Sequence, residues 1–314
     1  MVAPRPRVSV ILPTYNRRKV LPRAIDSVML QDEPDWELII VDDCSTDDTA
    51  SFLQSLTDPR IRVIALPRNL GVSGARNAGL EAAQADVVAF LDSDDVYLQG
   101  RLSAPLAVFA RWPDVVCTLS SAIKHNRNGS EQVARLPDAI FESKVFGWGL
   151  ICALFDAAGT NITVRRSAAM AVGGFQPNLP FVEAEDFMLR ISRQGRGCLL
   201  SAVLWEKFRS ADAMSRRWQD AGAGLLYYAQ AHPEYLTRHR KVATYFATKL
   251  LVYEFRDGSL VTFQRHLRAF RRAGLISGNI KQICRDHWDV KRYRRAISSP
   301  AALASMTGPP DSWM

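Results

Sequence analysis

A run of five apolar residues, 87–91, leads directly into three acids at Asp92, Asp94 and Asp95. An apolar run of this length predicts a central strand that is buried on both faces. Open parallel sheets bind ligands beyond the carboxyl ends of their strands, which is where these acids would lie. Crowded carboxylates repel one another unless a cation intervenes, and a hard divalent ion with positions left for phosphate oxygens fits such a site. Acids after a strand can also cap the next helix or solvate a turn, so this stretch alone leaves both interpretations open.

Strand and helix patterns alternate through residues 1–100. We predict strands at residues 7–12, 36–41 and 60–66, and helices at residues 16–30, 45–56 and 71–84. Asn16 is expected to cap the first helix, and Ser45 with Asp48 resembles the start of a capping box for the second. Alternation this tight predicts a mostly parallel sheet with helices on both faces, the arrangement of α/β domains.

Polar groups recur where the predicted strands end. Thr14, Tyr15 and Asn16 follow the first strand, and Asp42 and Asp43 follow the second. Because the carboxyl ends of parallel strands share one edge of a sheet, these groups and the later acids outline one side of a crevice. The turn at residues 71–74, GVSG, is neither a P-loop nor a GxGxxG fingerprint, which argues against an ATPase and against a nicotinamide enzyme.

The bulk features of the 314-residue chain predict one large domain, or one domain with an appendage. No uninterrupted apolar run exceeds six residues, whereas a membrane-spanning helix needs about 20. The N-terminus passes from a short basic arm into a strand, without an apolar signal-peptide core. Five scattered cysteines, never in CxxC spacing, favour reduced thiols over disulfides or a zinc site. We therefore expect a cytoplasmic protein.

The net charge of +8 is distributed unevenly along the chain. Residues 205–300 hold 19 Lys and Arg against 8 Asp and Glu, a net +11, and the rest of the chain carries −3. Nucleic acid, anionic lipid or an acidic substrate could each explain this excess, and so could a merely solvated helical surface. The basic third lacks a platform of interleaved aromatic and basic residues, so no nucleic-acid partner is expected.

Four motifs, taken together, resemble a known family. They are PTYNR at 13–17, VDDCSTDDT at 41–49, NLGVSGARNAGL at 69–80 and FLDSDD at 90–95. In this order and spacing they resemble family 2 of the inverting, nucleotide-sugar-dependent glycosyltransferases, over about residues 8–217. The resemblance implies a Rossmann-like GT-A fold, a UDP-sugar donor, a divalent metal ion (Mn²⁺ or Mg²⁺), and a saccharide or lipid-linked acceptor.

The resemblance also assigns roles around the donor. Tyr15 would offer a flat face to the base, Asp43 would accept from a base N–H, and Arg76 would lie near the base and phosphates. Asp94 would ligate the metal ion that bridges the diphosphate, with Asp95 close to the sugar or the acceptor. The remaining donor contacts implied are Pro13, Thr14, Asn16, Asp92 at the ribose, and Ser93. Without the family, Tyr15 reads as a turn aromatic, Asp43 as a helix cap and Arg76 as a surface ion-pair partner.

The middle of the chain gives weaker signals. A strand is predicted at residues 114–121, a polar hairpin or loop at 125–132 and another strand at 159–165. Trp148 lies between two glycines, which predicts a flexible loop. Its ring could stack on a sugar, or it could be a packing plug.

The predicted catalytic element contains Glu185 and Asp186 in the first turn of a helix, where the helix dipole favours ionised acids. A group that takes a proton from a sugar hydroxyl at neutral pH should start as a carboxylate. In the family, the aspartate of this Glu-Asp pair is the general base, and it maps to Asp186. Glu185 would contact sugar hydroxyls or support the site. Taken alone, both acids could simply serve the helix dipole.

Residues 205–217 resemble the loop that closes over the diphosphate in relatives. Many relatives carry a histidine there, and this chain has none. The absence leaves a further protein ligand for the metal ion in doubt. Arg209, Arg216 or Arg217 could offset the diphosphate charge instead.

Beyond residue 225 the pattern becomes helical and the resemblance fades. Helices are predicted at residues 240–256 and 260–272, the second with four arginines opposite its apolar side. Such a helix can lie on an anionic membrane as a peripheral contact, or pack on the domain and leave its arginines in solvent. We predict a GT-A domain at 1–217, with a nucleotide-binding half at about 1–100 and a catalytic half at 101–217. A helical extension at 218–297 and a disordered tail at 298–314 would follow.

These features predict an inverting hexosyltransferase of polysaccharide or glycan biosynthesis. Asp186 would be the general base, and a metal ion on Asp94 would stabilise the departing diphosphate. The alternative is a catalytically degenerate family member that acts as a binding or scaffold subunit.

Overall fold

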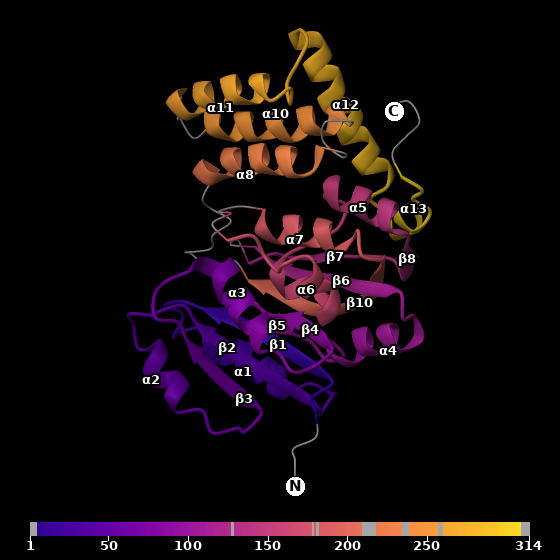
Figure 1. Cartoon of the computed structure of the whole chain (residues 1–314). Helices are drawn as coiled ribbons and strands as arrows, with labels where there is room; N and C mark the ends of the chain where they lie inside the picture. Colours follow the sequence, from indigo (N-terminus) through magenta and orange to yellow (C-terminus); the bar gives the residue numbers. More distant parts are fainter. Residues whose placement is uncertain are drawn as a thin grey trace.

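The computed structural model describes residues 5–126, 129–177, 179, 182–208, 218–233, 239–256 and 260–308. Within these residues, an α/β part built on one large sheet lies below a group of C-terminal helices (Figure 1). None of the described helices is both long enough and apolar enough to cross a membrane.

The first part of the chain alternates strand and helix as its sequence predicts. Its elements are β1 (Val8–Thr14), α1 (Leu21–Met29), β2 (Trp36–Asp42), α2 (Thr49–Gln54), β3 (Ile61–Ala65), α3 (Gly71–Ala82) and β4 (Val87–Phe90). Every residue of β1, β2 and β4 is buried, as expected for strands covered on both faces. β1 pairs in parallel with β2 and β4, and β2 with β3, which confirms the predicted parallel sheet.

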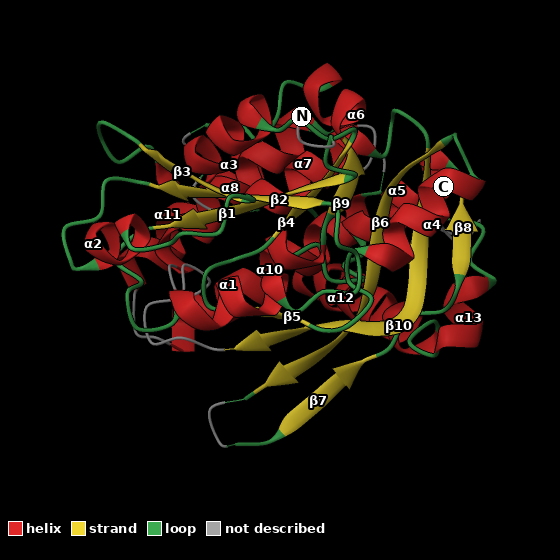
Figure 2. Cartoon of the chain, turned by 90° about the horizontal axis from the view of Figure 1, so that it is seen from below, coloured by secondary structure: helices red, strands yellow, loops and turns green. Residues whose placement is uncertain are grey.

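The second part extends this sheet and includes a strand that runs antiparallel to its neighbours. Its elements are β5 (Val96–Tyr97), α4 (Ser103–Arg111), β6 (Val115–His125), β7 (Glu131–Ala134), β8 (Ala139–Phe141), α5 (Ser143–Ile151), η1 (Gly159–Asn161), β9 (Thr163–Arg165), α6 (Arg166–Ala171), α7 (Glu183–Ile191) and β10 (Arg196–Phe208). β9 runs antiparallel to both β4 and β6, and β10 runs parallel to β6. The sheet order is therefore β3-β2-β1-β4-β9-β6-β10-β5. β7 pairs back on β6 as a hairpin that extends from the body of the protein (Figure 2).

Each face of the sheet has its own apolar core, because strand side chains alternate between the two faces. Val10 and Leu12 pack in the core that contains residues of α1 and α4, whereas Ile11 packs with residues of α3, α6 and α7. Figure 2 shows α1 and α3 on opposite sides of the sheet. A Cβ at Gly79 of α3 would come within 2.4 Å of the Ile11 side chain, so α3 requires a glycine at this contact with the sheet.

The C-terminal part is helical and basic. Its described elements are α8 (Trp218–Ala231), α10 (Arg240–Arg256), α11 (Leu260–Arg272), α12 (Ile280–Ala296) and α13 (Pro300–Ala304). The bounds of α10 and α11 match the predicted helices. α10 contacts α8, α11 and α12, and Val242, Phe270 and Val290 are fully buried among them. The C-terminal helices therefore form a packed group whose apolar core is continuous with the core on the α3, α6 and α7 face of the sheet.

Two predicted helix caps are wrong. Asn16 lies in the left-handed region at φ 53°, and its side-chain oxygen accepts from the Thr46 backbone N–H at 2.7 Å. It therefore ties the connection after β1 to the connection after β2, and α1 begins only at Leu21. The Ser45 hydroxyl donates to Asp42, and α2 begins only at Thr49. In both cases the polar side chain bonds to a residue at or just beyond the end of β2 and does not cap the following helix.

The segment around Trp148 is a helix and not the predicted loop. Trp148 lies in α5 with 1% of its surface exposed, and its Nε1 donates to the Tyr293 hydroxyl of α12 at 3.0 Å. A ring enclosed in this way presents no face to a sugar, so the packing role is correct.

The predicted disorder from Ser298 is wrong for residues 298–308. Ser299 caps α13, its side chain accepting from the Ala302 N–H, and Leu303 is buried. Residues 309–314 lie outside the described part of the chain.

Candidate active site

The carboxyl ends of β2, β1 and β4 lie next to one another at one edge of the sheet. This order brings Asp42 and Asp43, then Pro13, Thr14 and Tyr15, and then the acids that follow β4 to the same edge. Tyr15 is 44% exposed there, whereas Thr14 is buried and its hydroxyl has no hydrogen-bond partner among the described residues. A buried hydroxyl without a hydrogen-bond partner is uncommon in native structures, and this one directly precedes an exposed aromatic ring.

Asp43 joins this edge to the start of α3. The buried Asp43 carboxylate accepts from the Leu70 backbone N–H at 2.6 Å, and Asn69 Nδ2 donates to the Asp43 carbonyl. Burial raises the pKa of Asp43, while hydrogen bonds from the Leu70 and Gly71 backbone oppose the rise. Asp43 thus anchors the turn before α3.

The three acids after β4 have different environments. Asp95 is 2% exposed, and its two oxygens accept from the Thr160 hydroxyl at 2.5 Å and the Phe208 N–H at 3.1 Å. Asp92 and Asp94 are both partly exposed, and Ser93 is buried between them. Burial, and then the charges of Asp92 and Asp94, raise the pKa of Asp95 well above its ordinary value. Asp95 therefore supports the site structurally, through buried hydrogen bonds to Thr160 and Phe208. Its carboxylate does not face a sugar or acceptor, contrary to its predicted role.

A short turn after α5 holds these acids in place. The strand predicted at residues 159–165 is divided into the 3₁₀ turn η1 and the short β9. Thr160 of η1 donates to Asp95 and accepts from the Asp92 N–H at 3.1 Å. The fully buried Arg101 donates to the Thr160 carbonyl and to the Thr163 hydroxyl. Sequence reasoning missed Thr160 and Arg101 because their partners come from distant segments.

Arg76 bridges two parts of the site. It is 2% exposed and pairs with Asp92 at 2.7 Å and with Glu183 at 3.3 Å. Its guanidinium also lies 5.0 Å from the centre of the Phe175 ring. Arg76 is therefore a buried link between the end of β4 and the start of α7, and neither a surface residue nor one that the structure places at the base.

Glu185 faces a mixed cluster of charges. Asp156 pairs with Lys124 at 2.7 Å and lies 3.9 Å from Lys207, near the end of β10. Burial, and then the charges of Glu183 and Asp156, raise the pKa of Glu185 to about 7. Burial opposes the positive charge of Lys207, but Asp156, Asp95, Asp92 and Glu185 together raise the pKa of its ammonium group. Lys207 thus belongs to the same electrostatic cluster as the acids after β4.

Asp186 points away from this cluster. It is fully buried, its Oδ2 accepts from Arg190 Nε at 2.9 Å and Nη2 at 2.6 Å, and its Oδ1 lies 2.9 Å from His232 Nε2. Burial opposes ionisation of Asp186, but the hydrogen bonds from His232 and Arg190 keep its pKa below the ordinary value. The predicted helix start is correct, yet the two acids of α7 face different surroundings, and Asp186 joins α7 to the end of α8.

The predicted arginine contacts to the diphosphate cannot be placed. Arg209, Arg216 and Arg217 lie outside the described residues. The first residues of the predicted loop, Trp205 to Phe208, form the end of β10 instead. They do so because Trp205 and Glu206 pair with both β5 and β6.

The acids at this edge fit a metal ion only with help from a ligand. Among the described residues, no three acids, histidines or cysteines form a set that could hold an ion alone. Asp95 is engaged by Thr160 and Phe208, and Asp92 pairs with Arg76. The partly exposed Asp94 carboxylate would be the protein ligand of a cation that takes its other oxygen ligands from a bound diphosphate.

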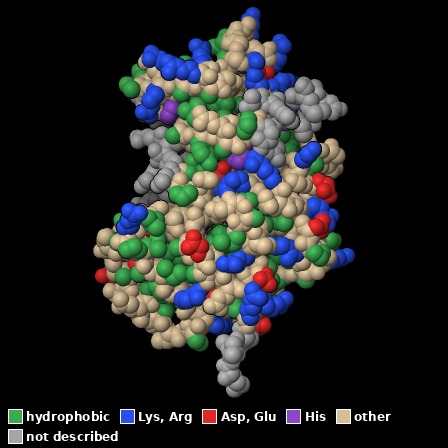
Figure 3. All heavy atoms as spheres, in the orientation of Figure 1, with side chains coloured by type: hydrophobic (Ala, Val, Ile, Leu, Met, Phe, Trp, Pro, Cys, Tyr) green, Lys and Arg blue, Asp and Glu red, His purple; other side chains and the backbone are tan. Residues whose placement is uncertain are grey.

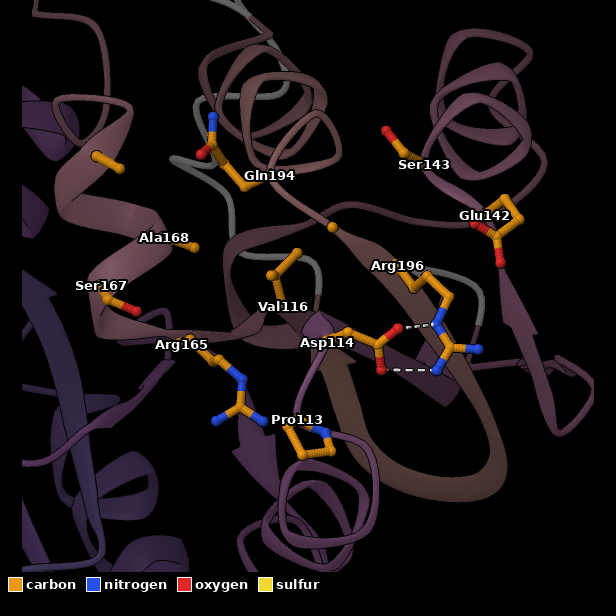
Figure 4. Close-up of a pocket in the computed structure, with 12 residues that line it drawn as sticks. Pro113, Asp114, Val116, Glu142, Ser143, Arg165, Ser167, Ala168, Gln194 and Arg196 are labelled. Carbon is orange, nitrogen blue, oxygen red and sulfur yellow. Dashed lines mark hydrogen bonds and ion pairs between the residues drawn. The ribbon is translucent and has the colours of Figure 1, made fainter.

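A larger hollow lies away from these acids. It has a volume of about 620 Å³ and is located where β6 and β10 begin, which is the opposite edge of the sheet (Figure 4). Asp114 and Arg196 form an ion pair across it, and Arg165 donates to the Val115 and Phe109 carbonyls. Because it lies at the opposite edge of the sheet, this hollow is not the crevice that the strand ends outline.

Comparison with known proteins identifies the class. The family model described as glycosyl transferase family 2 matches residues 9–173, which include all four sequence motifs. The chain therefore belongs to glycosyl transferase family 2.

Individual relatives match over a shorter segment. Succinoglycan biosynthesis protein ExoO of Rhizobium meliloti is 44% identical over 97 residues, which is 31% of this chain and 28% of that protein. The GalNAc(5)-diNAcBac-PP-undecaprenol beta-1,3-glucosyltransferase of Campylobacter jejuni is 46% identical over 102 residues, which is 31% of this chain and 33% of that protein. The matched segment thus spans less than half of either relative.

Solved structures share the fold. S. aureus TarS 1-349 in complex with UDP-GlcNAc has a TM-score of 0.61 at 20% identity, covering 85% of this chain and 92% of that chain. Mannosyltransferase PcManGT from Pyrobaculum calidifontis, in complex with GDP-Man and Mn²⁺, has a TM-score of 0.59 at 20% identity, covering 96% and 86%. The predicted GT-A-like fold is confirmed by these neighbours.

Proposed function

We propose that the protein transfers a hexose from a UDP-sugar to a hydroxyl group of a saccharide or lipid-linked acceptor. The observation that carries the proposal is the position of Lys207, which lies within electrostatic reach both of Asp92 and Asp95 at the ligand-binding edge of the sheet and of Glu185 on α7. Family membership supports it, as do the nucleotide sugars bound by the two structural neighbours and the undecaprenol-linked acceptor in the name of the Campylobacter relative.

The donor would lie over the ends of β1, β2 and β4. Tyr15 offers its exposed ring to the base, and Asp43 shapes the turn beside it. Asp92, which Arg76 holds by an ion pair, would face the ribose. A divalent ion on Asp94, Mn²⁺ or Mg²⁺, would supply positive charge to the departing diphosphate.

Glu185 replaces Asp186 as the proton acceptor in this proposal. The acceptor oxygen forms a bond to the anomeric carbon as the bond from that carbon to the diphosphate breaks, with inversion. Glu185 takes the hydroxyl proton. A base whose pKa lies near 7 combines a large ionised fraction with useful basicity at neutral pH. Both oxygens of Asp186 already receive hydrogen bonds inside the protein.

The donor site has a direct test. UDP at about 100 times its Kd should stabilise the protein by about 2.7 kcal/mol, measured as a rise in melting temperature. We expect the rise to require Mn²⁺ or Mg²⁺ and to disappear in Asp94→Ala. Asp114→Asn, at the opposite edge of the sheet, serves as the control. A rise that is equal in Asp94→Ala would contradict the metal assignment.

A non-catalytic binding subunit remains the second candidate, because the acid that the family motif indicates, Asp186, is turned away from the site. Such a subunit would bind UDP with metal but would not turn over. Slow hydrolysis of a UDP-sugar by the wild-type protein, absent from Glu185→Gln, would rule it out.

We also propose that the C-terminal helices contact an anionic membrane from one side. Figure 3 shows Lys and Arg side chains gathered over these helices at the top of the view. Near the end of α10 and the start of α11, Phe255 is 61% exposed and Val261 is 82% exposed. Exposed apolar residues beside arginines are typical of helices that lie in a bilayer interface.

Phe255→Ser/Val261→Ser should reduce co-flotation with vesicles that contain anionic lipid by about tenfold, because each side chain loses its buried area in the bilayer. The matched control is Val63→Ser/Met170→Ser, which removes two exposed apolar residues from the α/β part. Equal flotation of both variants and the wild-type protein would contradict the contact.

A further inference from the structure

A second hollow lies in the C-terminal part, between the end of α5 and the last turns of α12. Its volume is about 330 Å³, and it is lined by Ala153, Leu154, Tyr245, Lys291, Arg294 and Arg295, with Ile297 and Ser298 closing it. Three cationic side chains and no carboxylate line it. Its size is within the range of small-ligand sites, about 300 to 1,000 Å³.

The cations of this hollow lack acidic partners. No ion pair of the described residues involves Lys291, Arg294 or Arg295. The nearest acid on α12, Asp289, is instead paired with Lys241 at 3.0 Å and Arg292 at 2.6 Å. The positive charge of the hollow is therefore uncompensated within the part of the chain that the structure describes.

The excess positive charge contributes to lowered pKa values of neighbouring basic groups. Burial, and then the charge of Arg294, lower the pKa of Lys249. Burial, and then the charges of Lys291 and Lys249, lower the pKa of His287. Two basic groups beside the hollow thus lose protons more readily than usual, as expected where cations crowd together without a counter-ion.

The guanidinium of Arg294 is held rigidly. Its Nη1 donates to the Tyr245 hydroxyl at 2.7 Å and its Nη2 donates to the Ala153 carbonyl at 3.0 Å. Its Nε is buried and has no hydrogen-bond partner among the described residues. Lys291 rests 4.4 Å from the centre of the Trp288 ring. A guanidinium that two hydrogen bonds already hold loses little freedom when it binds a compact anion.

We propose that this hollow is a binding site for a phosphate or diphosphate group. Arginine and lysine bind phosphate oxygens through charge-assisted hydrogen bonds, and a bound phosphate would neutralise the crowded cations. The group can come from a free anion or from the headgroup of a lipid. The inference rests on the charge and shape of the hollow alone and does not require that the protein be a glycosyltransferase.

The test uses inorganic pyrophosphate and the full-length protein in EDTA, with the dissociation constant measured by calorimetry. Lys291→Gln/Arg295→Gln should weaken binding by about tenfold or more, because each removed cation takes a charge-assisted hydrogen bond with it. Arg294 is left in place since it supports Tyr245 and Ala153. Arg111→Gln/Lys144→Gln makes the same charge change at exposed positions of α4 and α5 and should bind as the wild-type protein does. UDP binding with Mn²⁺ should be equal in all three proteins, which separates this hollow from the donor site.

Vesicles separate the two sources of phosphate. If flotation with vesicles of phosphatidylcholine and phosphatidylglycerol falls in Lys291→Gln/Arg295→Gln alone, and pyrophosphate competes with the vesicles, the group is a lipid headgroup. If pyrophosphate binds as expected and flotation is unchanged, the site serves a free anion. The proposal is overturned if pyrophosphate does not bind the wild-type protein, or if the hollow variant and the control variant weaken binding equally.

Discussion

Glu185→Gln is expected to reduce sugar transfer by about 10²- to 10⁴-fold, the usual contribution of a general base. The amide keeps the shape of the side chain but cannot accept the proton of the attacking hydroxyl. Binding of UDP with metal should be unchanged, because the proposed contacts to the nucleotide and the metal ion come from residues after β1, β2 and β4 and not from α7. The melting temperature should be equal or slightly higher, since the variant removes a carboxylate whose ionised form is disfavoured by burial and then by the charges of Glu183 and Asp156. Initial rates of UDP release with an accepted sugar, together with melting curves, measure both effects.

The same assignment predicts the pH dependence of the wild-type protein. The pKa of Glu185 is raised to about 7, so the ionised, proton-accepting form is lost as the pH falls through 7. We expect kcat/KM to decrease by about tenfold for each pH unit below that value. The residual activity of Glu185→Gln should not show this decrease of kcat/KM below pH 7. If the same decrease of kcat/KM is seen in the variant, the titrating group is not Glu185.

Asp186→Asn provides the contrast to Glu185→Gln, since the two acids are adjacent in sequence. If Asp186→Asn abolishes transfer in folded protein while Glu185→Gln leaves it near normal, the assignment proposed here is wrong and the family motif is the better guide.

The strands and their polar ends could be predicted from the sequence because they depend on local patterns. Buried runs such as residues 87–91 and acids placed directly after them determine both the parallel sheet and the edge where its ligands bind. The helix that starts before Glu185 could be predicted in the same way, because its acids and its apolar spacing are contiguous.

The direction of each side chain could not be predicted in this way. Glu185 and Asp186 have the same local signals, and what separates them is His232, which reaches Asp186 from the end of α8. The sequence predicts Trp148 in a loop, whereas in the structure its ring donates a hydrogen bond to Tyr293 of α12. Local sequence alone makes Arg76 a surface residue, whereas in the structure it is paired with Glu183 of α7. In each case the deciding contact comes from a segment far away in the sequence, so no local pattern predicts it.

Asp186→Ala is expected to lower the free energy of unfolding by about 3 to 5 kcal/mol, the usual cost of removing one member of a buried ion pair. The variant leaves Arg190 and the buried His232 without the fully buried carboxylate that both contact. Arg190 keeps its bonds to the Val172 and Gly174 carbonyls, so α7 should retain its position while its junction with α8 weakens. Urea unfolding measures the loss, and Asp114→Asn, in an exposed ion pair, should change it little.

The loss should depend on pH in a definite direction. The pKa of Asp186 is lower in the folded protein than in the unfolded chain, so its contribution is fully present above the unfolded value and disappears as the pH falls through the folded value. The wild-type protein and Asp186→Ala should therefore differ most at neutral pH and converge in acid. A destabilisation that is constant across this range would mean that Asp186 acts through its volume and not through its charge. Because Asp186 joins the helix that carries Glu185 to the C-terminal helices, a charge-dependent loss would also show that these helices stabilise the proposed catalytic element.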